Sequence, residues 1–155
     1  MEIIEPHISQ VLPLFRALHT YHADLDPSIY PCDAPDAEFM ALLSGAMSLG
    51  GQLFAHDAGW GLVSYVLAKP EFIERDALRM ARRSVRIDHL YVCPAARGLG
   101  LGQQLIARVE DWMREIGFDA WHVVYHCDNP GAAEFYAAIG ATPSKGISEI
   151  GRAHV

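Results

Sequence analysis

The chain has 155 residues and a formal net charge of -7; 51% of its residues are hydrophobic and 20% are charged. This is the composition of a folded globular chain, so intrinsic disorder is excluded, and the length predicts one domain spanning residues 1–155. The acidic excess lies wholly in residues 1–68, because residues 69–155 hold equal numbers of acids and bases. That distribution argues against a nucleic-acid-binding protein, which needs a basic face, and it is compatible with a cationic substrate.

Helical spacing of apolar residues predicts a first helix over residues 8–22, with Ser9 as its candidate N-cap. Pro13 must lie in the first turn of this helix or kink it. A second helix is predicted over residues 36–47, after a loop that contains three prolines, and Gly50-Gly51 ends it.

The apolar period then changes to that of strands. Residues 52–56 and 61–68 read as a hairpin around the turn Asp57-Ala58-Gly59. Residues 70–84 are predicted to be a charged connector, partly helical in character. Residues 85–93 read as the next strand, which Pro94 ends.

The second half of the chain continues with a predicted helix over residues 100–116, followed by Gly117 at the C′ position. A strand is predicted over residues 120–127. A short helix follows, with Asn129 as N-cap, Pro130 in the first position and Gly140 at its end. This order of elements predicts an α/β or α+β domain, and the tail from residue 141 is weakly patterned.

The N-terminus and the cysteines bear on the compartment. Residues 1–6 lack the positive flank and apolar core of a secretory signal, and no apolar run approaches the roughly 18 residues of a membrane span. Three cysteines at scattered spacing fit reduced thiols better than a disulfide framework or a zinc site: Cys32, Cys93 and Cys127. We therefore expect a cytoplasmic protein without a metal and without membrane contact.

The stretch Arg97-Gly98-Leu99-Gly100-Leu101-Gly102 lies between a predicted strand and a predicted helix. Glycines allow a sharp turn and a close approach to a ligand, and the first-turn amides of a helix attract phosphate. The spacing excludes a P-loop, because no Lys-Ser/Thr follows the glycines. It also excludes the dinucleotide fingerprint, because Gln103 and Leu105 stand where the last glycine is needed.

The stretch Ile87–Gly102 closely resembles the acetyl-CoA motif of the GCN5-related N-acetyltransferase (GNAT) family: an apolar strand ending in Val-x-Pro, then Arg-Gly-x-Gly-x-Gly and an amphipathic helix. A second family motif follows as Asn129-x-x-Ala132-x-x-Phe135-Tyr136-x-x-x-Gly140. The resemblance implies the GNAT fold. Its central sheet is mixed and mostly antiparallel, with about six or seven strands, about four flanking helices and two strands that splay apart.

The resemblance also implies where the acyl donor, acetyl-CoA, binds. The pantetheine arm would lie between strands 85–93 and 120–127 and pair with backbone groups of Leu90 and Val92, and the amides of the glycine turn would hold the pyrophosphate. No metal is implied. The implied cofactor-binding residues are Leu90, Tyr91, Val92, Arg97, Gly98, Leu99, Gly100, Leu101, Gly102, Asn129 and Tyr136.

The implied reaction is direct transfer of the acetyl group to a primary amine of a small molecule, a peptide N-terminus or a lysine. Tyr136 is the candidate acid for the CoA sulfur; the alternative is an aromatic packed in the core, a role that fits Phe135 better. Asp88 is the candidate base, on a strand face shared with Leu90 and Val92; the alternative is an ion pair with Arg86 or another neighbour.

The acceptor amine would contact the loop near residues 20–36 and the end of the last predicted strand. The candidate acceptor residues are Tyr21, His22, Tyr30 and His126. Two other functions stay open: a non-catalytic CoA-binding sensor or partner-binding domain on the same fold, and a toxin that acetylates aminoacyl-tRNA, which the acidic balance disfavours. A homodimer is compatible with the sequence.

Overall fold

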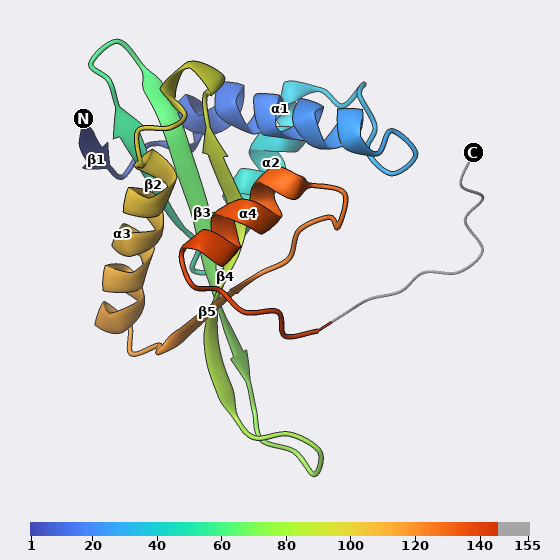
Figure 1. Cartoon of the computed structure of the whole chain (residues 1–155), viewed down its shortest axis with the longest axis vertical. Coiled ribbons are helices and arrows are strands. Elements are labelled where there is room, and N and C mark those ends of the chain that lie inside the picture. The colour runs from blue at the N-terminus through green and yellow to red at the C-terminus, as the bar shows by residue number, and fades with distance from the viewer. Residues whose placement is uncertain (146–155) are drawn as a thin grey trace. The chain divides into compact units, whose positions relative to one another are not determined.

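A computed structural model describes residues 1–145 (Figure 1). Residues Met1–Val124 form one compact unit, and a second unit begins at Tyr125. The predicted division into a single domain stays a prediction, and most of the weakly patterned tail, residues 146–155, lies outside the described residues. The elements are β1 (Glu2–Ile4), α1 (Ile8–Leu25), α2 (Asp36–Ser48), β2 (Gln52–Asp57), β3 (Leu62–Ile73), β4 (Arg82–Val92), the 3-10 helix η1 (Pro94–Ala96), α3 (Leu101–Glu115), β5 (Ala120–Val123) and α4 (Pro130–Ala138).

The first unit contains one sheet with the strand order β1-β2-β3-β4-β5. The first three pairings are antiparallel and the last, between β4 and β5, is parallel. This confirms the predicted mixed, mostly antiparallel sheet. Within residues 1–145 it has five strands, fewer than the six or seven expected, and its edge strand β1 has no counterpart among the predicted elements.

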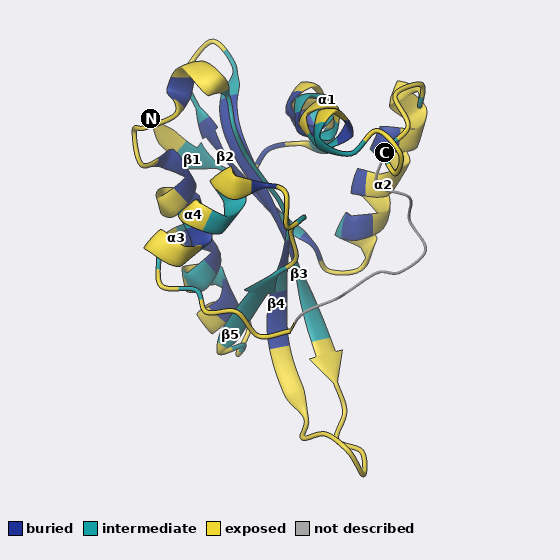
Figure 2. Cartoon of the chain, turned by 45° about the vertical axis from the view of Figure 1, so that its right-hand side comes forward, coloured by how far each residue is buried: buried dark blue, intermediate teal, exposed yellow. Residues whose placement is uncertain are grey.

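The two faces of this sheet carry different helices. On one face α1 and α2 pack on β2 and β3 through a cluster of buried side chains that includes Val11, Leu43 and Tyr65. On the other face lies α3, where the Arg108 guanidinium sits 4.3 Å from the centre of the Phe54 ring. Figure 2 shows the buried residues concentrated along the central strands. Each fully buried aliphatic side chain stabilises this core by about 1.5–3 kcal/mol.

The ends of α1 and α3 illustrate how capping is decided. His7, and not the predicted Ser9, caps α1, because the His7 ring accepts from the Ser9 N–H at 3.2 Å while the His7 N–H donates to the Gln10 side chain at 2.8 Å. A histidine is an uncommon cap, and nothing in the sequence distinguished it. At the C-terminal end of α3, Gly117 has φ 79°, which confirms its predicted C′ role.

The predicted connector over residues 70–84 is instead the outer half of a long hairpin. β3 runs on to Ile73 and pairs with β4 from Arg82, and the Asp76 carboxylate accepts from the N–H groups of Leu78 and Arg79 at 2.8 Å each in the turn. The charged residues that suggested a connector are tolerated because this end of the hairpin is exposed (Figure 2).

A bulge interrupts the β3–β4 pairing and overturns the predicted alternation of side chains. Leu67 pairs with His89 and Ala68 pairs with Ile87, so Asp88 has no partner across the ladder. Bulges leave one residue unpaired and redirect its neighbours. As a result Asp88 contacts Lys69 and Arg86. The expectation that Asp88 shares a strand face with Leu90 and Val92 is therefore wrong.

The strand predicted over residues 120–127 ends at Val123. Beyond it, the Asp128 N–H donates to the His126 ring at 3.1 Å and the Asn129 N–H donates to the His126 carbonyl at 3.0 Å. These local bonds form a turn, so residues 124–127 are not a strand although their composition favours one.

Candidate functional site

The glycine turn between β4 and α3 has the conformation that the motif predicted. Gly98 has φ 80° and Gly100 has φ 78°, in the left-handed region that costs other residues about 1–2 kcal/mol. A Cβ added at either position would meet no atom within 4 Å. Glycine is therefore required here by the backbone angle and not by crowding, and the space in front of the turn is open to a ligand.

The N-terminus of α3 follows at once. Gly100 is its N-cap and provides no capping side chain, whereas the Asn129 side chain caps α4. The first N–H groups of a helix have no carbonyl partner within it, and the helix dipole adds positive potential there. Leu101 is buried at 5% exposure, and Leu99 is exposed at 61%. The turn therefore offers backbone amides, rather than side chains, to an anion such as a phosphate.

Arg97 places a positive charge beside this turn. Its Nε donates to the Val92 carbonyl at 3.0 Å, and its guanidinium lies 5.9 Å from the centre of the Tyr91 ring. The side chain is exposed, so its remaining N–H groups can reach a phosphate oxygen. The Val92 carbonyl, which was expected to pair with the pantetheine arm, accepts this hydrogen bond.

β5 pairs with only part of the edge of β4 that faces it. The β4–β5 ladder runs only from Ser84 to Ile87 on β4, and β4 continues beyond it to Val92. The expected pantetheine residues Leu90, Tyr91 and Val92 all lie in this continuation. Within the first unit, the end of the parallel ladder therefore agrees with the predicted splaying of the two strands.

The candidate base Asp88 is held by two cations. Its carboxylate lies 2.9 Å from Lys69 Nζ and 2.9 Å from Arg86 Nε, and its side chain is only 15% exposed. Arg86 also lies 3.9 Å from Glu71, which in turn contacts His122 at 3.2 Å. The alternative interpretation of Asp88, an ion pair with Arg86, is thus present in the structure, and its role as base stays a prediction.

His89, next to Asp88, was not among the predicted site residues. Its ring stacks on Phe15 at 4.4 Å, and Nδ1 lies 3.1 Å from the Tyr65 hydroxyl. Burial lowers the pKa of His89 to about 4, against the opposing charge of Asp88, so the ring is neutral at pH 7. No motif in the sequence points to His89, because its position depends on the bulge.

Three of the four candidate acceptor residues come together near the C-terminal end of α1. The ring of His22 lies 6.0 Å from Tyr21 and 5.7 Å from Tyr30, measured between centroids. Asp24, Asp26 and Asp33 belong to the same stretch and carry no neighbouring Lys or Arg in sequence. This stretch of aromatic and acidic side chains suits a cation. The fourth residue, His126, belongs to the second unit.

In the second unit, Asn129 and Tyr136 lie at opposite ends of one helix. The Asn129 side chain accepts from the Ala132 N–H at 3.1 Å, which confirms the predicted N-cap. Tyr136 is 6% exposed and stacks on Tyr125 at 5.6 Å. Burial, with a smaller contribution from Tyr125, raises the pKa of Tyr136. Tyr136 is more buried than Phe135, contrary to the expectation that Phe135 would be the packed aromatic.

A protein-family model matches most of this chain. The model described as the acetyltransferase (GNAT) family matches residues 18–141. The chain belongs to the GNAT family. The match extends the resemblance well beyond the two motifs, into α1, α2 and the β2–β3 hairpin. A comparison with curated proteins finds no match.

Solved structures share the GNAT fold over nearly the whole chain. A tetramutant of the BH1408 protein from Bacillus halodurans has a TM-score of 0.85 at 19% identity, covering 98% of this chain and 100% of that one. A ribosomal-protein-alanine N-acetyltransferase from Brucella melitensis biovar Abortus 2308 has 0.70 at 18%, covering 98% and 100%. The aminoglycoside N-acetyltransferase AAC(6')-Iy, solved with CoA, has 0.72 at 18%, covering 97% and 93%.

The described helices were also compared with the requirements of a bilayer. Within residues 1–145, none of them combines the length and the apolar character needed to cross a membrane.

Proposed function

We propose that this GNAT protein is an acetyl-CoA-dependent N-acetyltransferase acting on a primary amine of a small molecule, a peptide N-terminus or a lysine. One observation carries the proposal. The left-handed glycines 98 and 100 lead into the uncapped N-terminus of α3, directly after a β4 edge that β5 leaves uncovered. A backbone anion seat beside an open strand edge suits a ligand with a pyrophosphate and an amide-bearing arm.

Different residues are proposed to bind the pyrophosphate and the amide-bearing arm of the donor. The amides from Gly98 to Gly102 hold the pyrophosphate, with Arg97 neutralising part of its charge. Backbone groups of β4 from Leu90 to Val92 pair with the amide-bearing arm. Arg97 Nε donates to the Val92 carbonyl, so the remaining N–H groups of its guanidinium are the ones proposed to contact the phosphate. The CoA complex of AAC(6')-Iy supports this class of donor.

In the proposed reaction Asp88 takes one proton from the ammonium, which leaves a neutral amine. The amine nitrogen then bonds to the thioester carbon, the carbon–sulfur bond breaks, and Tyr136 gives its proton to the departing thiolate. The second proton that the nitrogen loses as the amide forms returns Tyr136 to its protonated state. Burial raises the pKa of Tyr136, so its hydroxyl carries the proton at neutral pH and gives it up only to the strongly basic thiolate. Asp88 becomes available only when the ammonium of the acceptor replaces Lys69 or Arg86 as its ion-pair partner.

The acceptor is proposed to be a cation before it reacts. Residues 1–68 carry the whole acidic excess, and the stretch with Tyr21, His22 and Tyr30 includes three aspartates. Such a surface raises the local concentration of ammonium groups and disfavours anionic acceptors. The aminoglycoside and ribosomal-protein acetyltransferases that share the fold act on amines, which is consistent with this class.

The test is release of free CoA thiol from acetyl-CoA over a panel of polyamines, aminoglycosides, N-terminal peptides and lysine peptides. Calorimetric binding of CoA is measured alongside. Turnover on at least one amine, lost in Gly100→Val and kept in Gly117→Val, supports the proposal. No CoA binding by the unmodified protein would overturn it.

The two ion pairs at Asp88 favour one second candidate, a CoA-binding sensor without catalysis, because they occupy the carboxylate that the reaction needs. Tight CoA binding with no thiol release on any amine would support the sensor. Turnover would exclude it.

A further inference from the structure

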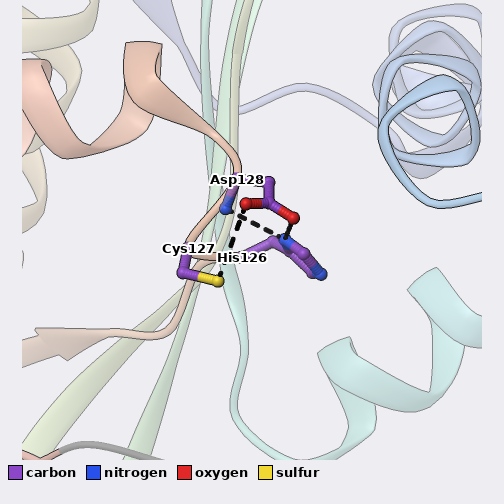
Figure 3. Close-up of side chains that lie close together, drawn as sticks. All are labelled: His126, Cys127 and Asp128. Carbon is purple, nitrogen blue, oxygen red and sulfur yellow. Dashed lines mark hydrogen bonds and ion pairs between the residues drawn. The ribbon is translucent and has the colours of Figure 1, made fainter. Parts of the chain in front are cut away.

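The turn before α4 gathers three residues with metal-binding side chains. Figure 3 shows His126, Cys127 and Asp128, whose donor atoms all lie within 4.8 Å of one another. His126 Nδ1 is 3.8 Å from an Asp128 carboxylate oxygen, and Cys127 Sγ is 4.0 Å from the other. All three belong to the second unit, and none has an assigned role in donor binding.

This gathering depends on the early end of β5. In a strand, successive side chains point to opposite faces, so residues 126 and 127 would diverge. The turn closed by the Asn129 N–H on the His126 carbonyl brings them to one side instead. The sequence predicted no metal site here, because residues 120–127 were expected to form a strand.

The His126 ring acts as a hydrogen-bond acceptor in this turn. The Asp128 N–H donates to Nδ1 at 3.1 Å, so the Nδ1 lone pair is directed toward Asp128. A metal ion binds imidazole through such a ring nitrogen. A metal at Nδ1 would replace that hydrogen bond, whose net contribution to stability is about 1 kcal/mol.

The chemistry of the three donors selects the ion. A thiolate with an imidazole and a carboxylate suits Zn²⁺ or Co²⁺ and not Mg²⁺ or Ca²⁺, which prefer oxygen. Two ligands at the Zn–N, Zn–O and Zn–S bond lengths of tetrahedral coordination are about 3.3–3.6 Å apart. The His126–Asp128 and Cys127–Asp128 separations are 3.8 and 4.0 Å, and all three donor atoms lie within 4.8 Å of one another. Binding an ion would therefore draw the donors together by up to about 1 Å. Cys127 and Asp128 are exposed, so an ion can enter.

We propose that His126, Cys127 and Asp128 bind a divalent transition-metal ion of the zinc type. The Cys127 thiol releases its proton to solvent as the sulfur–metal bond forms, and a water completes the coordination. Because Asn129, the N-cap of α4, follows Asp128 directly, the ion fixes the turn that begins this helix. The site shares only His126, a candidate acceptor residue, with the proposed acetyl transfer, and none of its three residues is proposed to bind the donor.

The experiment adds cobalt(II) chloride to the full, tag-free, reduced protein and records the thiolate-to-cobalt charge-transfer absorption. Cys127→Ser is compared with Cys32→Ser, a matched change at the other exposed cysteine. The band should be lost in Cys127→Ser, be unchanged in Cys32→Ser, and need about tenfold more cobalt in Asp128→Asn. Circular dichroism checks that each variant is folded.

A second readout uses zinc chloride and iodoacetamide, with mass spectrometry of the modified peptides. Zinc should slow alkylation of Cys127 and leave that of Cys32 unchanged. Absence of the cobalt band from the unmodified protein, or its persistence in Cys127→Ser, would overturn the proposal. Equal protection of both cysteines by zinc would overturn it as well.

Discussion

The polar cluster around Asp88 in β4 and the glycine turn before α3 lie only about ten residues apart in the chain, yet they are built in different ways. The turn depends on backbone angles at Gly98 and Gly100, so three neighbouring sequence positions are enough to define it. The cluster depends on side chains from separate strands and from α1, including Lys69, His89 and Phe15.

This difference shows which kind of site a sequence motif can locate. A backbone site follows from local conformational preference, and glycine spacing reports that preference directly. A side-chain site follows from the register between strands, and one bulge in β3–β4 changes which residues meet. Five variants test the two halves of this comparison, from the largest expected effect to the smallest.

The strongest test of the backbone site is Gly100→Val. A β-branched residue cannot adopt φ 78° without strain, so the turn must rearrange and its amides lose their alignment. We expect acetyl-CoA affinity to fall by about a hundredfold or more, measured by calorimetry. Gly117→Val is the matched control, because Gly117 has φ 79° and lies about 22 Å away at the far end of α3. Equal losses in both variants would contradict the assignment of the turn.

Tyr136→Phe tests whether a family motif predicts a catalytic side chain. Without the hydroxyl, the departing thiolate has no proton donor, so kcat should fall about a hundredfold while acetyl-CoA affinity stays unchanged. Tyr125→Phe, which alters the stacked partner, should keep kcat within about twofold. A Tyr136→Phe enzyme with the rate of the unmodified protein would remove Tyr136 from the mechanism.

His89→Phe tests the polar cluster through the pH dependence of the free energy of unfolding. The pKa of His89 is about 4 in the folded protein and about 6.5 when unfolded, so the unfolded state binds the extra proton first. The stability that depends on neutral His89 is complete above pH 6.5 and is lost as pH falls from 6.5 toward 4.

We expect this loss to be about 2 kcal/mol of unfolding free energy in the unmodified protein, and to be absent from His89→Phe, whose ring keeps the contact with Phe15. Urea unfolding at pH 7 and pH 4.5 measures it. The same decrease in both proteins would show that other groups control acid stability.

Asp88→Asn separates the base from the ion pair. If Asp88 accepts the amine proton, kcat should fall about tenfold while acetyl-CoA affinity stays unchanged. Glu71→Gln is the comparison, because it disturbs Arg86 and His122 without touching Asp88. A lower stability with an unchanged kcat in Asp88→Asn would assign it a structural role only.

Arg97→Gln has the smallest expected effect. Its charge supplements a backbone seat, so acetyl-CoA should bind about threefold to tenfold more weakly, with a smaller dependence on salt. Arg114→Gln, at the other end of α3 and paired with Asp111, should bind as the unmodified protein does. An unchanged salt dependence in Arg97→Gln would place Arg97 outside the site.

Much of the fold was predictable because the signals are local. Apolar periodicity located α1, α2, α3 and α4 to within about three residues, and the positive φ of Gly117 and the Asn129 cap follow from residue type. The misassigned parts are the ones where pairing outweighed composition. The arginine-rich stretch became a hairpin because its backbone pairs across the turn, and residues 124–127 left the sheet because local hydrogen bonds replaced the ladder.

By itself the sequence determined the glycine turn, the helix that follows it and the family, because each depends on residues adjacent in the chain. Only the tertiary structure decided the partners of Asp88, the neutral state of His89 and the convergence of His126, Cys127 and Asp128. The physical reason is that charge pairing, desolvation and metal-ligand geometry depend on distances between side chains. Those distances are determined by strand register and by where a strand ends.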